Sequence, residues 1–139
     1  MKNTLLILLS TAAMLLSGCA TPHKSDLDTM QGQWSGRELT GNAQGGLSLT
    51  ISGQTLDYHN ADNSEWYKGI ITLREDTAPK QFFFLLTGSP DSQYVGKTAP
   101  GIYRFEAGTL YITVFGPDEP NPPSTFDAPG TRQVVFTRK

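Results

Sequence analysis

The stretch LSLTISGQTLDYH, residues 47–59, predicts a β-hairpin and, with it, the fold class. Leu47, Leu49 and Ile51 alternate with small polar residues, which is the period of a strand that buries one face. Gly53 stands between polar residues, a combination typical of a tight turn. We therefore expect antiparallel strands at 47–52 and 55–59, joined locally.

Short runs of the same kind recur along the chain, separated by turns rich in Gly, Asn and Asp. We predict strands at 33–39, 47–52, 55–59, 66–73, 81–87, 101–106, 110–115 and 133–138. Residues 25–30 begin with capping residues and predict one helical turn, with Leu27 and Met30 facing inward. The chain is therefore expected to be all-β, a single up-and-down antiparallel barrel whose closure leaves no exposed edge, with a β-sandwich as the alternative.

Residues 116–130 interrupt this pattern with prolines at 117, 120, 122, 123 and 129. Proline cannot donate a hydrogen bond to a neighbouring strand, so the segment predicts a long, stiff loop at the rim of the barrel. We expect Phe126 to pack back onto the barrel. A Pro-rich recognition segment is the alternative.

The N-terminal segment has the layout of an export signal: a charged start, an apolar middle at residues 5–16, and small residues after it. As a helix, residues 5–16 would rise roughly 18 Å, well short of the ~30 Å of bilayer hydrocarbon. The run Leu16-Ser17-Gly18-Cys19 that follows closely resembles the lipobox of bacterial lipoprotein precursors. The alternative is an ordinary secretory signal cut nearby, with Cys19 incidental.

The lipobox resemblance implies a domain organisation and a location. The Cys19 thiol would receive a diacylglyceryl group, the signal would be removed before it, and the new amine would commonly be acylated, for example with palmitate. Each buried methylene adds about 0.8 kcal/mol, so two or three chains hold a protein almost permanently. We expect a signal peptide at 1–18, a lipidated tether at 19–26 and a barrel domain at 27–139. Ala20, rather than Asp, favours the outer membrane over the inner one in a cell that has both.

The composition of the mature chain excludes several classes of function. Removing residues 1–18 leaves 121 of the 139 residues, with 10 basic against 13 acidic side chains. A net charge of about −3 without a basic stripe argues against a nucleic-acid partner. Cys19 is the only cysteine, so its lipidation leaves none for a disulfide, a metal or a nucleophile.

One predicted turn gathers several polar side chains. Alternation sends Asp57 and His59 to the same face of a strand, near a solvated loop. Asx-type bonding within the turn explains Asp62, and Glu65 lies too close in sequence to complete a calcium loop. We therefore expect no catalytic residues, no metal site, no cofactor and no enzymatic activity.

Gly32-Gln33-Trp34, on the first predicted strand, resembles the Gly-x-Trp motif of lipocalins and related calycin barrels. In those proteins the tryptophan closes one end of the barrel beneath a short N-terminal helix, and a basic residue of the last strand stacks on it. The resemblance implies that Trp34 and Arg138 close the barrel here, through a cation–π contact of about 0.5–2 kcal/mol.

The chain from residue 27 to 139 also resembles an uncharacterised lipocalin-like domain family that is numerous in planctomycetes. The matching segments are 30–34, 67–69, 79–80, 96–98, 101–103 and 108–110, with Pro123, Phe126 and Arg138. This family implies a fold and no particular activity. Two positions depart from it: Pro122 stands where Arg is usual, and Phe83 where an acidic residue is frequent, so roles for those polar groups are not carried over.

The run FFFLL at 82–86 is apolar on both faces of its predicted strand. Phe82, Phe84 and Leu86 would face the interior, which leaves Phe83 and Leu85 outward, either covered by another element or forming an interaction patch.

The interior either is filled or holds one small ligand. The aromatic side chains expected there are Trp34, Trp66 or Tyr67, Phe84, Tyr103 and Tyr111, and their number favours a filled lumen. We expect a non-catalytic envelope lipoprotein that contacts the membrane through Cys19 and whose barrel binds a small apolar ligand. The alternative is a structural or protein-interaction module with a packed barrel. A cavity of several hundred cubic ångströms would favour ligand binding.

Overall fold

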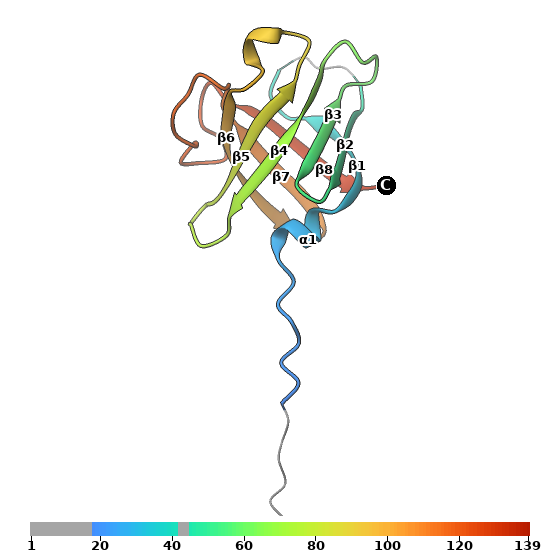
Figure 1. The fold of residues 1–139 in the computed structure, drawn as a ribbon, viewed down its shortest axis with the longest axis vertical. Coiled ribbons are helices and arrows are strands. Elements are labelled where there is room, and N and C mark those ends of the chain that lie inside the picture. Colours follow the sequence, from blue (N-terminus) through green and yellow to red (C-terminus); the bar gives the residue numbers. More distant parts are fainter. Residues whose placement is uncertain (1–17, 42–44) are drawn as a thin grey trace, which may run out of the picture.

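The first and last strands of the protein pair with each other, so the sheet closes into a barrel (Figure 1). This computed structural model describes residues 18–41 and 45–139. Eight antiparallel strands follow one another around the barrel in chain order. They are β1 (Gly32–Glu38), β2 (Leu47–Ser52), β3 (Thr55–His59), β4 (Trp66–Arg74), β5 (Lys80–Gly88), β6 (Thr98–Glu106), β7 (Thr109–Val114) and β8 (Arg132–Arg138). The helical pieces are α1 (Asp26–Met30) and the 3₁₀ turn η1 (Ser92–Tyr94).

The up-and-down barrel predicted from the sequence is confirmed, and the β-sandwich alternative is wrong. The strand bounds differ from those predicted by at most one residue, except that β6 begins at Thr98. Pro100 is paired with Phe83 inside the sheet although it has no N–H to donate. Its carbonyl oxygen accepts a hydrogen bond from the Phe115 amide at 2.9 Å, so the strand continues through the proline.

Helix α1 covers one end of the barrel, beneath the strands in Figure 1. Ser25 caps it reciprocally with Asp28, since the Ser25 hydroxyl accepts from the Asp28 amide and the Asp28 carboxylate accepts from the Ser25 amide. Met30 is fully buried and Leu27 packs against the core. The i, i+3 spacing therefore places both side chains inward, as the sequence predicted.

Asp26 fixes α1 to the barrel. Its carboxylate accepts hydrogen bonds from Lys80 Nζ at 2.6 Å and from the Tyr103 hydroxyl at 2.8 Å. Its amide donates to Glu75 Oε1 at 2.7 Å. Burial alone would raise the pKa of Asp26, but the hydrogen bonds from Lys80 and Tyr103 outweigh it and lower the pKa. The helix is thus held by charged contacts to β5 and β6 as well as by Met30.

The segment 116–130 packs on the outside of β6 and β7. Thr113 Oγ1 donates to the carbonyl oxygen of Phe126 at 3.0 Å, and the Arg104 guanidinium lies 4.4 Å from the centre of the Phe126 ring. Ile102, which points outward on β6, is fully buried. The predicted return of Phe126 onto the barrel is confirmed, and the segment shields one outer face of the sheet.

Tyr111 was expected inside the barrel and lies outside it. Its ring is stacked under Arg104 at 4.6 Å, while its neighbours Leu110 and Ile112 are in the core. Because Leu110 and Ile112 face inward, strand alternation sends Tyr111 to the opposite face.

Candidate ligand-binding cavity

The end of the barrel near α1 is filled by aromatic side chains. Trp34 is almost completely buried, and its indole N–H donates to the carbonyl oxygen of Met30 at 2.8 Å. The ring centres of Trp34 and Tyr103 lie 6.5 and 6.3 Å, respectively, from that of Phe105. These three rings occupy the lumen next to α1.

Arg138 lies over the Trp34 ring, with its guanidinium carbon 4.3 Å from the ring centre. The guanidinium also donates to the carbonyl oxygens of Gln31, at 2.7 Å, and of Thr29. The contact thereby joins β8 to β1 and to the end of α1. Both residues lie where the Gly-x-Trp resemblance implied.

The other half of the lumen is hollow, with a cavity of about 550 Å³. It reaches the strand ends opposite α1, at residues 38–41, 115–117 and 130–132, which we call the open end. Most of its wall is apolar: Leu49, Leu56, Phe82, Phe84, Leu86, Ala99, Ile112, Val114, Val134 and Phe136. The expectation of a filled lumen therefore holds only for the α1 half.

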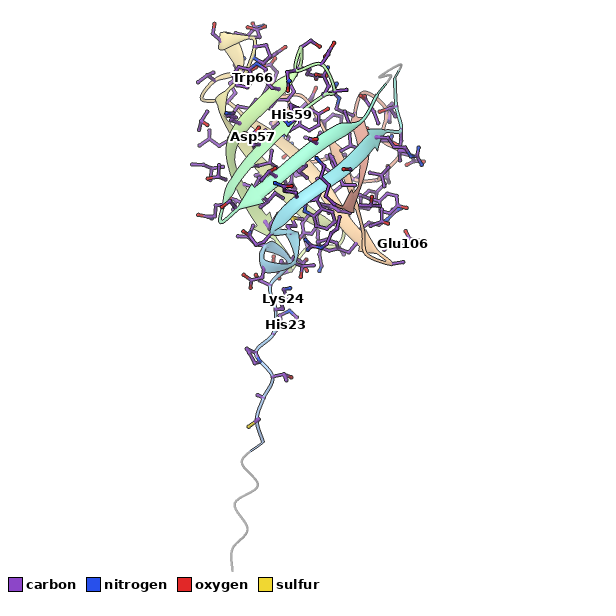
Figure 2. The ribbon with its side chains drawn as sticks, turned by 90° about the vertical axis from the view of Figure 1, so that its right-hand side faces the viewer. His23, Lys24, Asp57, His59, Trp66 and Glu106 are labelled. Atoms are coloured by element: carbon purple, nitrogen blue, oxygen red, sulfur yellow. The ribbon has the colours of Figure 1, made fainter. Side chains whose placement is uncertain are left out.

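One aromatic side chain expected in the lumen, Tyr111, lies outside the barrel, as described above. Of the alternatives Trp66 and Tyr67, Tyr67 faces the lumen. Trp66 instead lines an outer depression with Asp57 and His59, which Figure 2 also labels.

A charged cluster lies on the cavity wall toward the open end. Arg132 donates to both carboxylate oxygens of Glu65, with an Nη2–Oε2 distance of 3.0 Å, and its Nε lies 3.3 Å from Glu38 Oε1. The Tyr67 hydroxyl donates to Glu65 Oε1 at 3.0 Å. We call Glu38, Glu65, Tyr67 and Arg132 the Arg132 cluster. Its two carboxylates outnumber its one cation.

The contacts between Glu65 and Arg132 keep both of these groups ionised. Burial alone would raise the pKa of Glu65, but the hydrogen bonds and charge of Arg132, with the bond from Tyr67, hold it below its usual value. Burial would lower the pKa of Arg132, yet the carboxylates raise it overall. Burial, together with the charge of Glu65, raises the pKa of Tyr67 to about 12. At neutral pH, therefore, these groups satisfy one another.

Tyr58 is a further polar residue of the cavity wall and lies outside the Arg132 cluster. Its side chain lines the cavity and is 8% exposed, and its ring stacks on Tyr67 with centres 5.8 Å apart. Its hydroxyl has no hydrogen-bond partner among the described residues. Burial raises the pKa of Tyr58 to about 12, so the hydroxyl keeps its proton at neutral pH.

The sequence analysis did not single out Tyr58, Glu38 or Arg132. The alternation of Leu56 and Tyr58 on the strand at 55–59 could have placed Tyr58 inside the barrel. Nothing in the sequence links Arg132 to Glu65, because 67 positions separate the two residues in the chain.

The polar residues that are close in sequence around the predicted turn do not form one cluster in the structure. Asp57 lies outside, 3.4 Å from Lys68, and Asp62 accepts from the Ser64 amide at 3.0 Å, as expected of an Asx turn. Glu65 instead turns toward the cavity. In the described part of the chain, no three His, Cys, Asp or Glu side chains are arranged to hold a metal ion.

The outward pair Phe83 and Leu85 is covered only in part. The Arg74 guanidinium lies 5.0 Å from the Phe83 ring centre, and Phe83 is half-buried. Leu85 is 37% exposed beside its cross-strand neighbour Ile70, which is 42% exposed. The exposed apolar surface is therefore centred on Leu85 and Ile70, which we call the β4–β5 patch.

Cys19 is exposed, on the segment that leaves the barrel at the α1 end. Figure 2 shows His23 and Lys24 on this segment, between α1 and Cys19. The rest of the expected signal peptide, residues 1–17, lies outside the described residues. Over the residues that are described, no helix has the length and apolar character needed to cross a bilayer.

Comparisons with known proteins found no matching family model, curated protein or solved structure.

Proposed function

We propose that this protein is an envelope lipoprotein, held to the membrane through Cys19, whose lipocalin-like barrel binds a small apolar ligand. The observation that carries ligand binding is the cavity of about 550 Å³ in the open half of the barrel. Ligand pockets usually measure about 300–1,000 Å³ and combine an apolar wall with a few polar groups. The apolar wall and the Arg132 cluster fit that description.

The proposed anchor rests on the sequence of residues 1–19. The lipobox resemblance supports acylation of Cys19, and Ala20 favours the outer membrane. The kinship to the planctomycete lipocalin-like family is part of the same proposal, supported by the motifs at 30–34 and by Arg138. Native mass spectrometry of the protein purified from its own membrane measures the acyl mass on Cys19 and any retained ligand together. An unmodified thiol, or a chain that starts after residue 19, contradicts the anchor.

Ligand binding is tested by filling the cavity. Ala99 faces the cavity and is 7% exposed, so Ala99→Phe should occupy the space that a ligand needs. The binding of N-phenyl-1-naphthylamine, an apolar dye that fluoresces in apolar surroundings, is measured on the mature chain, residues 19–139, with Cys19→Ser to prevent acylation. We expect saturable binding that Ala99→Phe abolishes.

The matched control is Thr50→Phe, which adds the same ring to the exposed face of β2. We expect this variant to bind the dye normally. Equal loss of binding in both variants, or no saturable binding by the parent protein, argues against a ligand in the lumen.

A protein-interaction module is the second candidate, and the β4–β5 patch favours it. The segment 116–130 covers the outer face of β6 and β7. Ile70 on β4 and Leu85 on β5 remain exposed. Leu85→Asp should keep the barrel folded while it reduces self-association or the recovery of co-purifying envelope proteins. An unchanged sedimentation profile and an unchanged set of partners remove this candidate.

A further inference from the structure

The charges on the cavity wall restrict what kind of ligand head group can enter. Arg132 is the single basic residue among the side chains that line the cavity, and it is engaged by Glu65 and Glu38. A carboxylate ligand would approach two carboxylates without finding a free cation. Burying such a charge unpaired is strongly unfavourable.

An amine is not disfavoured in the same way, because the Arg132 cluster has one carboxylate more than it has cations. Glu65 accepts hydrogen bonds from Arg132 and Tyr67, and Glu38 is paired with the Arg132 Nε at 3.3 Å. The charges of the wall therefore distinguish a neutral head group from an anionic one.

Tyr58 is a buried polar residue of the wall whose hydroxyl has no partner among the described residues. Its hydroxyl is buried, keeps its proton at neutral pH and finds no acceptor among the residues described. A buried hydroxyl without a partner is costly, and the cost is recovered when a ligand supplies one. A single neutral oxygen, as in an alcohol or an ester, meets this requirement without adding charge.

We propose that the cavity selects a neutral amphiphile, an apolar chain with a hydroxyl or carbonyl oxygen that hydrogen-bonds to Tyr58, over a fatty carboxylate. This inference rests on the proposed ligand-binding function and specifies the chemical class of the ligand. Specificity arises because Arg132, the one basic side chain among the lining residues, is already engaged by two carboxylates.

The test uses ligands that share one alkyl chain and differ in the head group. 1-Decanol, methyl decanoate and decanoate are compared at pH 7 by their displacement of N-phenyl-1-naphthylamine from the mature chain with Cys19→Ser. We expect 1-decanol and methyl decanoate to bind at least about tenfold more tightly than decanoate. Because a neutral chain partitions better into any apolar cavity, the decisive comparison is between variants.

Tyr58→Phe removes the proposed hydrogen bond and keeps the ring. We expect it to weaken 1-decanol about fivefold to tenfold while dye binding stays the same. Tyr94→Phe is the matched control, because Tyr94 lines the same cavity but is only half-buried. It should leave the affinity for 1-decanol within about twofold of the parent value.

The outcomes separate this inference from the function on which it rests. Dye binding without a preference for the neutral compounds, or an unchanged 1-decanol affinity in Tyr58→Phe, overturns the selectivity and leaves ligand binding in place. A failure of the dye and of all three compounds to bind removes both. Tight binding of decanoate would show that Arg132 exchanges its partners, and this result contradicts the inference.

Discussion

Tyr58 and Tyr67 have the same side chain and stack on each other, but their hydroxyls have different surroundings. The Tyr67 hydroxyl donates to the Glu65 carboxylate at 3.0 Å, whereas the Tyr58 hydroxyl has no partner within the described residues. A hydrogen bond to a charged group stabilises a fold by about 1.5–3 kcal/mol, and a buried polar group without a partner costs about 1–3 kcal/mol. Removing the two hydroxyls should therefore have opposite effects.

In the ligand-free protein we expect Tyr58→Phe to raise the free energy of unfolding by about 1 kcal/mol, and Tyr67→Phe to lower it by about 1–2 kcal/mol. Urea denaturation followed by circular dichroism measures both changes. A gain of stability together with weaker 1-decanol binding is the signature of a group retained for binding. If Tyr58→Phe destabilises the barrel, its hydroxyl has a structural partner and the inference about the ligand loses its basis.

Glu65 makes the stability of the barrel depend on pH. Its pKa in the folded protein lies below the ordinary value of 4.5, because the partners Arg132 and Tyr67 outweigh the effect of burial. A lowered folded-state pKa means that the stabilisation is present above the unfolded-state pKa and is lost as the pH falls through the folded one. Glu65→Gln should therefore reduce the loss of stability that occurs as the pH falls below the ordinary glutamate pKa of 4.5.

The slope of the unfolding free energy against pH measures this effect, separately from the general destabilisation that the substitution causes. Asp26, whose pKa is also lowered, should leave part of the slope in place. An identical slope in the parent and in Glu65→Gln would mean that Glu65 is not held ionised by Arg132.

At the scale of elements, the strands were predictable because side-chain alternation and turn residues are local features of the sequence. For β2 and β3, these features predicted both ends of the strand without error. The start of β6 was not predicted, because a proline within a run argues against a strand. Pro100 lies in the sheet because it pairs with Phe83 of β5. The cavity was not predictable, because its volume depends on which aromatic side chains point inward from all eight strands. Tyr111 was expected inside and lies outside, and of the alternatives Trp66 and Tyr67 only Tyr67 faces the lumen.

The contact between Arg138 and Trp34 joins the last strand to the first at the α1 end. Arg138→Gln removes both the cation over the ring and the charged hydrogen bonds to Gln31 and Thr29. We expect a loss of about 1–2 kcal/mol in the free energy of unfolding, measured by urea denaturation. Lys139→Gln, which removes the same charge one residue later, is the control and should change stability by less than about 0.5 kcal/mol. Equal effects would show that net charge, and not the contact with Trp34, is responsible.

At the scale of the whole molecule, the proposed anchor and the cavity lie at opposite ends of the barrel. The segment that carries Cys19 leaves from the α1 end (Figure 1). The residues that line the cavity place its opening at the other end. Residues 20–25, fully extended, span about 20 Å. With acyl chains on Cys19 and α1 fixed to the barrel through Asp26, the open end should face away from the bilayer. A ligand would then exchange with the aqueous compartment.

This orientation is measurable because Cys19 is the one cysteine of the sequence, so the proposed acylation would leave no other thiol. A fluorophore is attached through Glu106→Cys, at the α1 end, or through Ala61→Cys, in the β3–β4 turn at the open end. Both side chains are exposed. In vesicles whose lipids carry a headgroup quencher, we expect stronger quenching at position 106 than at position 61. The reason is that the strands separate the two sites by roughly 20 Å. Equal or stronger quenching at position 61 would place the open end against the bilayer, and the ligand would then enter directly from the membrane.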